Sequence, residues 1–425
     1  MNVLFVSPLL RPAKEIYLGY HHGIGYLSSV LKNRGHATHL YSAYEVRPGE
    51  IRTVLRNKAI DAVAVTSTSA EFALAKAVAR EILSYGPLPL FFGGIHATLA
   101  PEEVMAIDGV TGLCRGEGEE GFAQVVDSLE KGKIEIKAPG FWMRDGEEWI
   151  KNPAGPPVPL TELPFPDREL FDYSTLLKHH SEIIGAEFLG SRGCPFSCTY
   201  CSLPVLQDLY APLSFCRRRP VNDLIDEILH VCSNYTVKMV GLHDDVFTLD
   251  SQWLASFCDE YRIRIRKPFW CNTRTGCISQ EDVRILRAAG CVRVHMAVES
   301  GSPFIRDKVL NRRISDEEIV ETFGFLKGAG IRTLAFNMIG LPFETEETIQ
   351  QTIALNRKIR PDRIHLTMFR PFPGTALHTL CKEQGWIKSN KDYSYYEEEP
   401  SMEQPQISRE SLIHYFHNFI RMVYE

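Results

Sequence analysis

Three closely spaced cysteines are the residues of this sequence whose type and spacing most directly suggest chemistry. Cys194, Cys198 and Cys201 form the pattern C-x3-C-x2-C. Three thiolates can hold three irons of a [4Fe-4S] cube and leave the fourth iron open to another ligand. The alternatives are core cysteines that cluster by chance and a zinc site, but zinc usually takes four ligands, often as two C-x2-C pairs. The sequence contains no second pair of this kind, so we interpret the motif as an iron–sulfur site.

The remaining cysteines are scattered along the chain, and we expect each to be a small buried apolar residue. They are Cys114, Cys216, Cys232, Cys258, Cys271, Cys277, Cys291 and Cys381. The first six residues have no basic segment before their apolar stretch, which predicts a β-strand rather than a signal peptide. We therefore expect reduced or metal-bound thiols and a cytoplasmic, anaerobic or reducing location.

The size and composition of the chain limit the classes of protein to consider. A chain of 425 residues exceeds the size of one hydrophobic core, which predicts two or more domains. No apolar run reaches 18 residues, so we expect no membrane span. The net charge of −6 gives no broad basic surface, so we expect no nucleic-acid partner. The short basic run Arg217–Arg219 predicts a solvated loop.

The cysteine motif directly follows the first of six predicted strands in the second half of the chain. These strands are Glu187–Gly190, Lys238–Leu242, Pro268–Thr273, Arg293–Val298, Thr333–Ile339 and Ile364–Phe369. The helices between them have start signals, since Ser279 with Asp282 and Ser315 with Glu318 form capping-box pairs. The alternation predicts a (β/α)6 partial TIM barrel over 181–380, whose reactive end is the C-terminal rim of its strands. A short C-terminal segment, 381–425, contains a predicted helix, Arg409–Val423.

The first 150 residues also alternate strands and helices, which predicts a doubly wound, Rossmann-like parallel sheet. The predicted strands are Val3–Val6, Thr38–Tyr41, Ala62–Thr66, Leu90–Phe92 and Gly112–Cys114. The predicted helices include Ile24–Asn33, Ala70–Leu83 and Glu119–Leu129. Such sheets bind ligands beyond the carboxyl ends of their strands. The proline-rich segment that follows predicts a linker over 151–180 between the two domains.

The motif, its place after a strand and the six β-α units resemble the radical S-adenosylmethionine (SAM) superfamily over about residues 181–375. The resemblance implies that the triad holds a [4Fe-4S] cluster whose open iron binds SAM. Tyr200, before the third cysteine, would lie near the adenine, and Glu299 and Ser300 match the E-S-G-S element near the ribose and methionine carboxylate. By the same resemblance the full set of SAM-binding residues is Tyr200, Asp244, Glu299, Ser300, Arg312, Asn337 and Leu341.

The first domain resembles the cobalamin-binding module that is found fused to radical SAM barrels. Glycines and small hydroxyl residues let a large cofactor approach the backbone, and helix N-termini offer N–H groups to its phosphate. The residues that the resemblance implies for cobalamin are Tyr20, His21, His22, Ser67, Thr68, Ser69, Gly93, Gly94, His96, Gly116 and Glu117.

The first loop departs from the D-x-H-x-x-G pattern in which the histidine ligates cobalt. His22 and Gly25 keep the H-x-x-G spacing, but no Asp precedes them. Alignment by the following helix places Tyr20 or His21 nearer the ligand position. The lower face of cobalamin is therefore either unligated or met by one of these three residues.

The two resemblances together imply a cobalamin-dependent radical SAM methyltransferase that methylates an unactivated sp3 carbon through a 5′-deoxyadenosyl radical and methylcobalamin. The implied cofactors are a [4Fe-4S] cluster, SAM and cobalamin, and an electron donor such as ferredoxin or flavodoxin is the implied partner. The expected substrate is a small molecule or a peptide or protein, for example methyl-coenzyme M reductase.

Two further functions stay open. One is a radical cyclase or ring-rearranging enzyme acting on a small natural product or a tetrapyrrole. The other is a non-catalytic cobalamin sensor, which would not need the intact triad. A radical methylthiotransferase would need three more cysteines in the first domain, and only Cys114 lies before the linker, so we exclude it.

Overall fold

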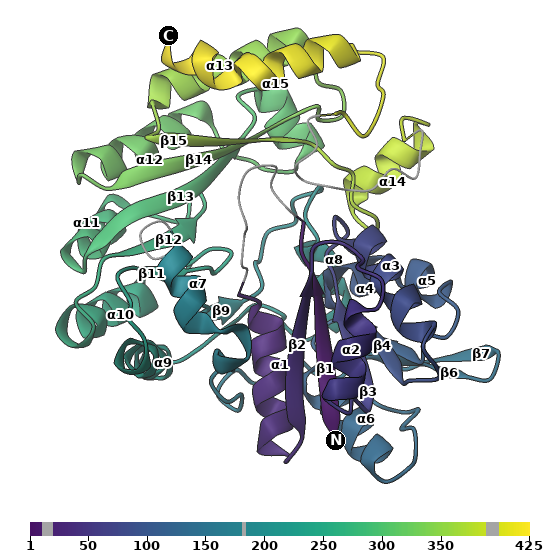
Figure 1. Ribbon diagram of the computed structural model, residues 1–425. Coiled ribbons are helices and arrows are strands. Elements are labelled where there is room, and N and C mark those ends of the chain that lie inside the picture. The colour runs from purple at the N-terminus through teal and green to yellow at the C-terminus, as the bar shows by residue number, and fades with distance from the viewer. Residues whose placement is uncertain (11–19, 181–183, 388–398) are drawn as a thin grey trace.

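The chain forms two α/β units, which the computed structural model describes for residues 1–10, 20–180, 184–387 and 399–425 (Figure 1). The first unit contains a seven-stranded sheet of order β2-β1-β3-β4-β5-β6-β7. Its strands are β1 (Asn2–Pro8), β2 (Ala37–Ala43), β3 (Ala62–Thr66), β4 (Leu90–Gly93), β5 (Gly112–Cys114), β6 (Phe141–Asp145) and β7 (Glu148–Lys151). The five predicted strands are present and parallel, and the predicted doubly wound fold is confirmed.

The last two strands are antiparallel and were not predicted. β6 pairs with β5, and β7 returns beside β6 after a two-residue turn in which Gly146 takes φ 64°. A turn this tight favours a residue with φ > 0, which glycine adopts without a steric penalty. The expectation of a wholly parallel sheet was therefore wrong at this edge. Lys151, which we placed in the linker, is the last residue of β7.

Helices cover both faces of the first sheet. They are α1 (His22–Asn33), α2 (Glu50–Asn57), α3 (Phe72–Leu83), α4 (Gly94–Leu99), α5 (Pro101–Met105) and α6 (Glu119–Glu130). In β1, Leu4 and Val6 pack in one apolar core with α3, while Val3 and Phe5 pack in a second core with α1 and α6. The alternating side chains of a strand explain this division, since neighbouring residues point to opposite faces.

The second unit contains six parallel strands of order β15-β14-β13-β12-β11-β8. They are β8 (Ala186–Phe188), β11 (Val240–Leu242), β12 (Phe269–Thr273), β13 (Cys291–Glu299), β14 (Arg332–Ile339) and β15 (Arg363–Met368). All six predicted strands are present, with ends that coincide with the predicted ones or differ by one or two residues. Within the described residues β8 and β15 lie at opposite edges and do not pair, so the partial barrel is open.

The helices that follow these strands lie on the outer face of the sheet (Figure 1). They are α9 (Val221–Asn234), α10 (Ser251–Arg264), α11 (Gln280–Ala288), α12 (Asp316–Gly328), α13 (Glu346–Ile359) and α15 (Arg409–Tyr424). The predicted capping boxes at Ser279 and Ser315 are both formed. Two further helices, α8 (Leu203–Tyr210) and α14 (Ala376–Glu383), lie near the first unit.

A small antiparallel pair, β9 (Ser191–Arg192) and β10 (Arg217–Arg218), flanks the cysteine motif. The expectation of a solvated loop at Arg217–Arg219 was wrong. Arg219 is buried and forms ion pairs with Glu227 and Asp223, because an unpaired guanidinium in this position would lose its hydration.

The segment 152–168 has no helix or strand, and it joins the two units. Ser29 Oγ donates a hydrogen bond to the backbone oxygen of Phe165, and Ser28 Oγ donates one to Asp167. The next residue, Arg168, is buried and pairs with Glu227 of α9 at 2.7 Å. A short turn, η1 (Glu169–Phe171), and α7 (Tyr173–His180) follow before β8. In the part of the chain that the structure describes, no helix combines the length and apolar character that crossing a bilayer requires.

Candidate active site between the two sheets

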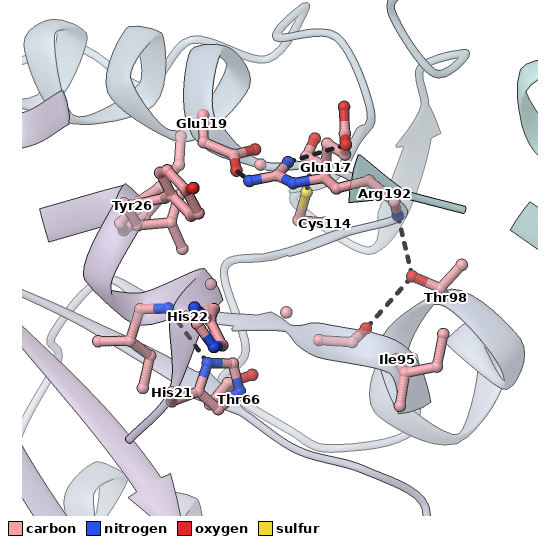
Figure 2. A pocket seen from close by; sticks show the side chains of 18 of the residues that line it. His21, His22, Tyr26, Thr66, Ile95, Thr98, Cys114, Glu117, Glu119 and Arg192 are labelled. Atoms are coloured by element: carbon pink, nitrogen blue, oxygen red, sulfur yellow. Dashed lines mark hydrogen bonds and ion pairs between the residues drawn. The ribbon is translucent and has the colours of Figure 1, made fainter. Parts of the chain in front are cut away.

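A cavity of about 360 Å³ lies where the two units meet (Figure 2). The first unit lines it with the loops that follow its parallel strands, including Thr66, Gly93 and Gly116. The second unit lines it with Gly193 of the cysteine loop and with Asp245, after β11. The cavity therefore lies at the carboxyl ends of both sets of strands, where α/β folds place their ligands.

Two adjacent glycines show how the first unit forms its wall. At Gly93 a Cβ atom would meet nothing within 4 Å, so its backbone lies bare beside the cavity. At Gly94, with φ 85°, a Cβ atom would lie 2.5 Å from Thr66 Oγ1 and 2.8 Å from the backbone oxygen of Ser67. A side chain on Gly94 has no space, whereas one on Gly93 would occupy the cavity. This bare backbone fits a bulky ligand that approaches the main chain closely.

The three candidate residues of the first loop have different surroundings. His21 caps α1, since its Nδ1 accepts a hydrogen bond from Ile24 N at 3.2 Å. His22 lines the cavity, and its Nε2 is buried without a hydrogen-bond partner among the described residues. Burial, together with His243, lowers the pKa of His22 well below its usual value, so the imidazole is neutral. Tyr20 does not line the cavity but packs against Tyr173 and under the guanidinium of Arg168.

Four other residues of the predicted cobalamin set lie outside the cavity lining. Thr68 bonds the carboxylate of Glu71 through both its N–H and its hydroxyl. Ser69 Oγ lies 3.0 Å from His96 Nδ1, and the ring of His96 stacks on Phe72 at 3.8 Å. The structure therefore places Thr68, Ser69 and His96 in contacts within the first unit. The fourth is Ser67, whose buried hydroxyl has no partner among the described residues.

A buried ion cluster connects the two units beside the cavity (Figure 2). Arg192, from β9, bonds Glu117 at 2.8 Å and Glu119 at 2.7 Å, and its guanidinium lies 4.9 Å from the ring centre of Tyr26. Arg217 also pairs with Glu117. Burial alone would raise the pKa of Glu117, but these two arginines hold it below its usual value. The carboxylate of Glu117 is thus charged and held between both units.

The three cysteines of the motif lie together in the loop between β9 and α8. Cys198 is buried, Cys194 and Cys201 are half-buried, and Cys201 N donates a hydrogen bond to the backbone oxygen of Cys198 at 3.1 Å. Burial raises the pKa of Cys194 and of Cys201 to about 11, and the neighbouring thiol of Cys198 adds to this effect in both. The raised pKa values of Cys194 and Cys201 fit a site that a cationic group completes.

Two buried arginines supply positive charge to the same thiol. Arg274 Nη1 donates to Cys198 Sγ at 3.4 Å, and its guanidinium lies 4.1 Å from the ring centre of Phe196. Arg312 Nη1 approaches Cys198 Sγ at 4.0 Å. Among the described residues, no group of His, Cys, Asp or Glu is arranged to hold a single metal ion. A cubane holds each thiolate on a different iron, so it requires wider spacing than one ion does.

Tyr200, Glu299 and Arg312 form a hydrogen-bonded triad beside the cysteine loop. Tyr200 OH donates to Glu299 Oε1 at 2.8 Å, and Arg312 Nη1 donates to Tyr200 OH at 3.1 Å. Glu299 has φ 65°, a strained conformation for a side-chain-bearing residue. The Nε atom of Arg312 is buried and has no hydrogen-bond partner among the described residues. The structure thus brings together three predicted residues and leaves one donor for a ligand.

The two neighbouring aspartates after β11 have different environments. Asp244 is fully buried, accepting hydrogen bonds from Gly190 N at 2.9 Å and from Ser191 Oγ. Asp245 lines the cavity, and burial followed by the charge of Asp244 raises its pKa to about 6. We predicted Asp244 as a ligand contact, but its oxygens hold the backbone before the cysteine motif, while Asp245 faces the cavity.

The remaining predicted SAM residues have contacts inside the barrel wall. The amides of Asn337 and Asn356 bond each other reciprocally, at 2.8 and 3.2 Å. The Ser300 hydroxyl accepts from Ser302 N at 3.2 Å. Leu341 is buried in an apolar cluster against which Tyr200 also packs. Leu341 therefore shares an apolar cluster with Tyr200, and Asn337 is the direct strand partner of Glu299.

Arg192, Arg274 and Asp245 were not predicted as site residues. The Asp pair after β11 was a visible signal, but it did not indicate which member faces the cavity. Arg274 follows directly on β12, at the same rim as the predicted residues. Arg192 lies two residues before Cys194, and its partners are distant in sequence, so no local pattern indicates them.

Two family models match complementary parts of the chain. A model of the B12 binding domain matches residues 17–126, and a model of the radical SAM superfamily matches residues 189–355. An uncharacterized methyltransferase of Pyrococcus horikoshii is 27% identical over 402 residues, which cover 89% of this chain and 82% of the relative. An anaerobic magnesium-protoporphyrin IX monomethyl ester cyclase of Cereibacter sphaeroides is 25% identical, covering 100% of this chain and 70% of the relative.

Solved structures share the arrangement of both units. The radical SAM methyltransferase TsrM from Kitasatospora setae, determined with cobalamin and a [4Fe-4S] cluster, superposes with a TM-score of 0.72. It is 18% identical, over 90% of this chain and 78% of that one. The cobalamin-dependent enzyme OxsB, with aqua-cobalamin, gives a TM-score of 0.69 at 18% identity, over 90% of this chain and 56% of that one. At these identities the similarity shows the fold.

The domain matches and the geometry agree. The exposed backbone at Gly93 lies in the region that the B12 binding domain model matches. The three clustered thiols lie in the region that the radical SAM model matches. The chain therefore combines a B12-binding domain with a radical SAM domain, and the cofactors that these two domains imply are cobalamin, a [4Fe-4S] cluster and SAM.

Proposed function

We propose that this chain is a cobalamin-dependent radical SAM methyltransferase that transfers a methyl group to an unactivated sp3 carbon. The observation that carries the proposal is the single cavity lined by both the glycine loops of the first unit and the rim beside the cysteine loop. In a common cavity, one substrate atom can be within reach of both cofactors, and such positioning is the protein's main contribution to cofactor chemistry.

The residues on the barrel side fit this assignment. Cys194, Cys198 and Cys201 would hold the cluster, and Arg274 and Arg312 place positive charge at Cys198. When bound, the cluster and SAM supply a 5′-deoxyadenosyl radical, and cobalamin supplies the methyl group. The free Nε of Arg312 is suited to a carboxylate such as that of the methionine part, because a guanidinium donates in a planar fork.

On the other side of the cavity, Gly93 would lie against cobalamin, and Gly94 keeps that backbone in place. Both His21 and His22 line the cavity, but His21 uses its Nδ1 to cap α1, whereas the buried Nε2 of His22 has no hydrogen-bond partner among the described residues. A neutral imidazole can ligate a metal. We therefore propose His22 as the residue that faces the lower side of the cofactor.

A direct test uses SAM with a labelled methyl group, under anaerobic conditions with added cobalamin and a low-potential reductant. The candidate substrates are peptides, including segments of methyl-coenzyme M reductase, and tetrapyrroles. Label in the substrate together with release of 5′-deoxyadenosine is the expected result. Label that stays on cobalamin while the substrate loses hydrogen would contradict methyl transfer and support a different radical reaction.

A second candidate function is radical cyclisation. The specific observation in its favour is that the magnesium-protoporphyrin IX monomethyl ester cyclase of Cereibacter sphaeroides aligns along the whole of this chain. In the experiment above, a cyclase releases 5′-deoxyadenosine and changes the substrate mass by loss of hydrogen or gain of oxygen, without gaining a methyl group.

A further inference from the structure

The inner face of the partial barrel carries a set of side chains that the proposed chemistry does not use. Residues alternate between the two faces of each strand. Cys271, Val294 and Ala335 belong to the apolar core beneath the outer helices. Their sequence neighbours Trp270 and His295 therefore point to the opposite, inner face. That face is the one turned away from α9–α13 (Figure 1).

Aromatic rings continue across this inner face from strand to strand. The ring of Trp270 lies 4.6 Å from His243 and stacks on His295 at 4.4 Å. Phe336 follows at 6.0 Å from His295, and His365 at 5.6 Å from Phe336. Trp270 is buried, His295 and Phe336 are half-buried, and His365 is exposed. The row presents ring faces and edges over neighbouring strands β11–β15.

The centre of this row is held rigidly. The indole N–H of Trp270 donates to the backbone oxygen of Ile184 at 2.7 Å. Gly241 lies under the ring, and a Cβ atom there would come within 2.7 Å of it. The Nε2 atom of His295 is buried and makes no hydrogen bond within the described residues, while Nε2 of His243 lies 3.3 Å from a carboxylate oxygen of Glu187. Preorganised rings with an unsatisfied nitrogen atom are typical of a binding surface rather than of a packed core.

Three arginines lie on the same face at the N-terminal ends of the strands. Arg293 and Arg332 are direct partners in the register of β13 and β14, and Arg363 of β15 pairs with Leu334, two residues along β14. The guanidinium of Arg293 lies 5.6 Å from the ring centre of Trp270. Arg332 and Arg363 are exposed, and neither has an acidic partner among the described residues.

Arg332 and Arg363 therefore place positive charge on this face without an acidic partner among the described residues. Like charges directly opposite each other on neighbouring strands destabilise a sheet. Burial, with the charges of Arg332 and Arg363, lowers the pKa of Arg293. Glu187, on the edge strand β8, is already paired with His243, whose Nε2 lies 3.3 Å from its carboxylate. A ligand with carboxylates would relieve the repulsion, and arginine is suited to bind them in pairs of hydrogen bonds.

We infer that the inner face of the barrel is the substrate site and that it takes a flat, conjugated molecule carrying at least two carboxylates. The carboxylates bind Arg332 and Arg363, and the conjugated part lies against Trp270, His295 and Phe336. The opposite edge of the molecule then points along the strands toward their C-terminal rim, where the cysteine loop and the cavity lie. This inference rests on the proposed function, because it assumes that the inner face of the barrel binds the substrate of that reaction.

Binding of a porphyrin tests the inference without turnover. The probe is metal-free mesoporphyrin IX, a flat dicarboxylate, compared with its dimethyl ester, which has the same ring and no charge. Both are titrated anaerobically against the enzyme loaded with cluster, cobalamin and SAM, and porphyrin fluorescence reports binding. The loaded enzyme is used so that the cavity between the two units is not open to the probe.

Three variants separate the contacts to the carboxylates from the contacts to the conjugated ring. Arg332→Gln with Arg363→Gln should weaken binding of the diacid by roughly tenfold or more and should leave the diester unchanged. Phe336→Leu should weaken both forms severalfold, because it removes stacking rather than charge. Arg287→Gln, an exposed arginine on the outer helix α11, is the matched control and should change neither.

Equal affinity of the unmodified enzyme for the diacid and the diester would overturn the inference. An unchanged affinity for the diacid in the Arg332→Gln, Arg363→Gln double variant would also overturn it. Displacement of the porphyrin by a short RNA, with the same dependence on Arg332 and Arg363, would assign the face to nucleic acid instead. The proposed function has a separate readout. Absence of methyl transfer and deoxyadenosine with intact diacid binding would refute that function and leave this site standing.

Discussion

The two sides of the cavity are built in different ways. On the barrel side, the charged side chains of Arg192 and Asp245 line the cavity, and beyond that lining Arg274 and Arg312 contact the thiol of Cys198. On the side of the first unit, the backbone forms the wall at Gly93, and Gly94 has no space for a side chain. The binding properties of the barrel side therefore depend on which side chains are present, and those of the first unit depend on the space that its glycines leave open. Substitutions should break the two sides in different ways.

The largest effect is expected from the thiols. Changing Cys194, Cys198 and Cys201 to alanine removes every cysteine ligand that we assign to the cluster. Iron, sulfide and 5′-deoxyadenosine formation should fall to background, while cobalamin binding, measured by absorption after gel filtration, should remain. Cys232→Ala, on the outer helix α9, is the control and should keep all of these properties. Retention of a cubane spectrum in the triple variant would contradict the assignment.

The next effect concerns the cation beside the thiols. Arg312→Leu removes the buried guanidinium that bonds Tyr200 and faces Cys198. Hydrogen bonds to charged groups contribute roughly 1.5–3 kcal/mol, so SAM affinity should fall roughly 10- to 100-fold in equilibrium dialysis. Arg312→Lys should lose less, because it keeps the charge. The exposed neighbour offers a control, and Arg313→Gln should bind SAM normally. An unchanged affinity in Arg312→Leu would remove this residue from the site.

The ion cluster between the two units gives a stability effect. Arg192→Met leaves the buried carboxylate of Glu119 without its arginine and leaves Glu117 with Arg217 alone. Breaking a buried pair costs about 3–5 kcal/mol. Arg34 is the matched control, since it also bonds two carboxylates but is part-exposed, and Arg34→Met should cost under about 1 kcal/mol. Urea unfolding measures the free energy of unfolding of both variants. Equal losses of stability would show that the buried ion cluster stabilises the fold no more than an exposed ion pair does.

The glycine pair tests the side that is built from shape. Gly94→Ala should destabilise the fold by about 1–3 kcal/mol, because φ is positive and the new methyl group meets Thr66 and Ser67. Gly93→Ala should unfold as the unmodified protein does, because its methyl group points into open space, yet bind cobalamin more weakly. Thermal unfolding and cobalamin titration separate the two outcomes. Normal cobalamin binding by Gly93→Ala would place the cofactor elsewhere.

The smallest effect concerns a barrel carboxyl that is not charged. Burial raises the pKa of Glu344 to about 8, although Gly340 N and Leu341 N donate to it. The folded state therefore binds a proton that the unfolded chain has lost above about pH 4.5. Stability should fall between these two pKa values, by at most about 1.4 kcal/mol per pH unit. Glu344→Gln should flatten this slope in unfolding measured from pH 5 to 8, and parallel slopes would contradict the protonated state.

The same contrast explains what could be predicted from sequence. The strands of both sheets follow from apolar runs and turn residues, and the cysteine motif follows from residue type and spacing. Tyr200, Glu299 and Arg312 were expected at one rim, and the structure joins them by hydrogen bonds. Side-chain sites are visible in a sequence because their chemistry restricts which residues can form them.

The rest depends on contacts that have no local pattern. The partners of Arg192 lie more than 70 positions away and become neighbours only when the two units dock. A hydroxyl-rich stretch such as 66–69 signals a loop but not which side chain faces the cavity, and here only Thr66 lines it. The antiparallel hairpin of β6 and β7 begins in a stretch without helical or strand alternation, so its pairing was missed.

The cavity has walls from two units that only a linker and their mutual contacts hold together. A molecule bound there touches both, so it acts as a non-covalent cross-link. By mass action, an occupant at one hundred times its Kd stabilises the docked arrangement by roughly 2.7 kcal/mol. An occupant of the cavity should therefore make the docking of the two units more resistant to unfolding.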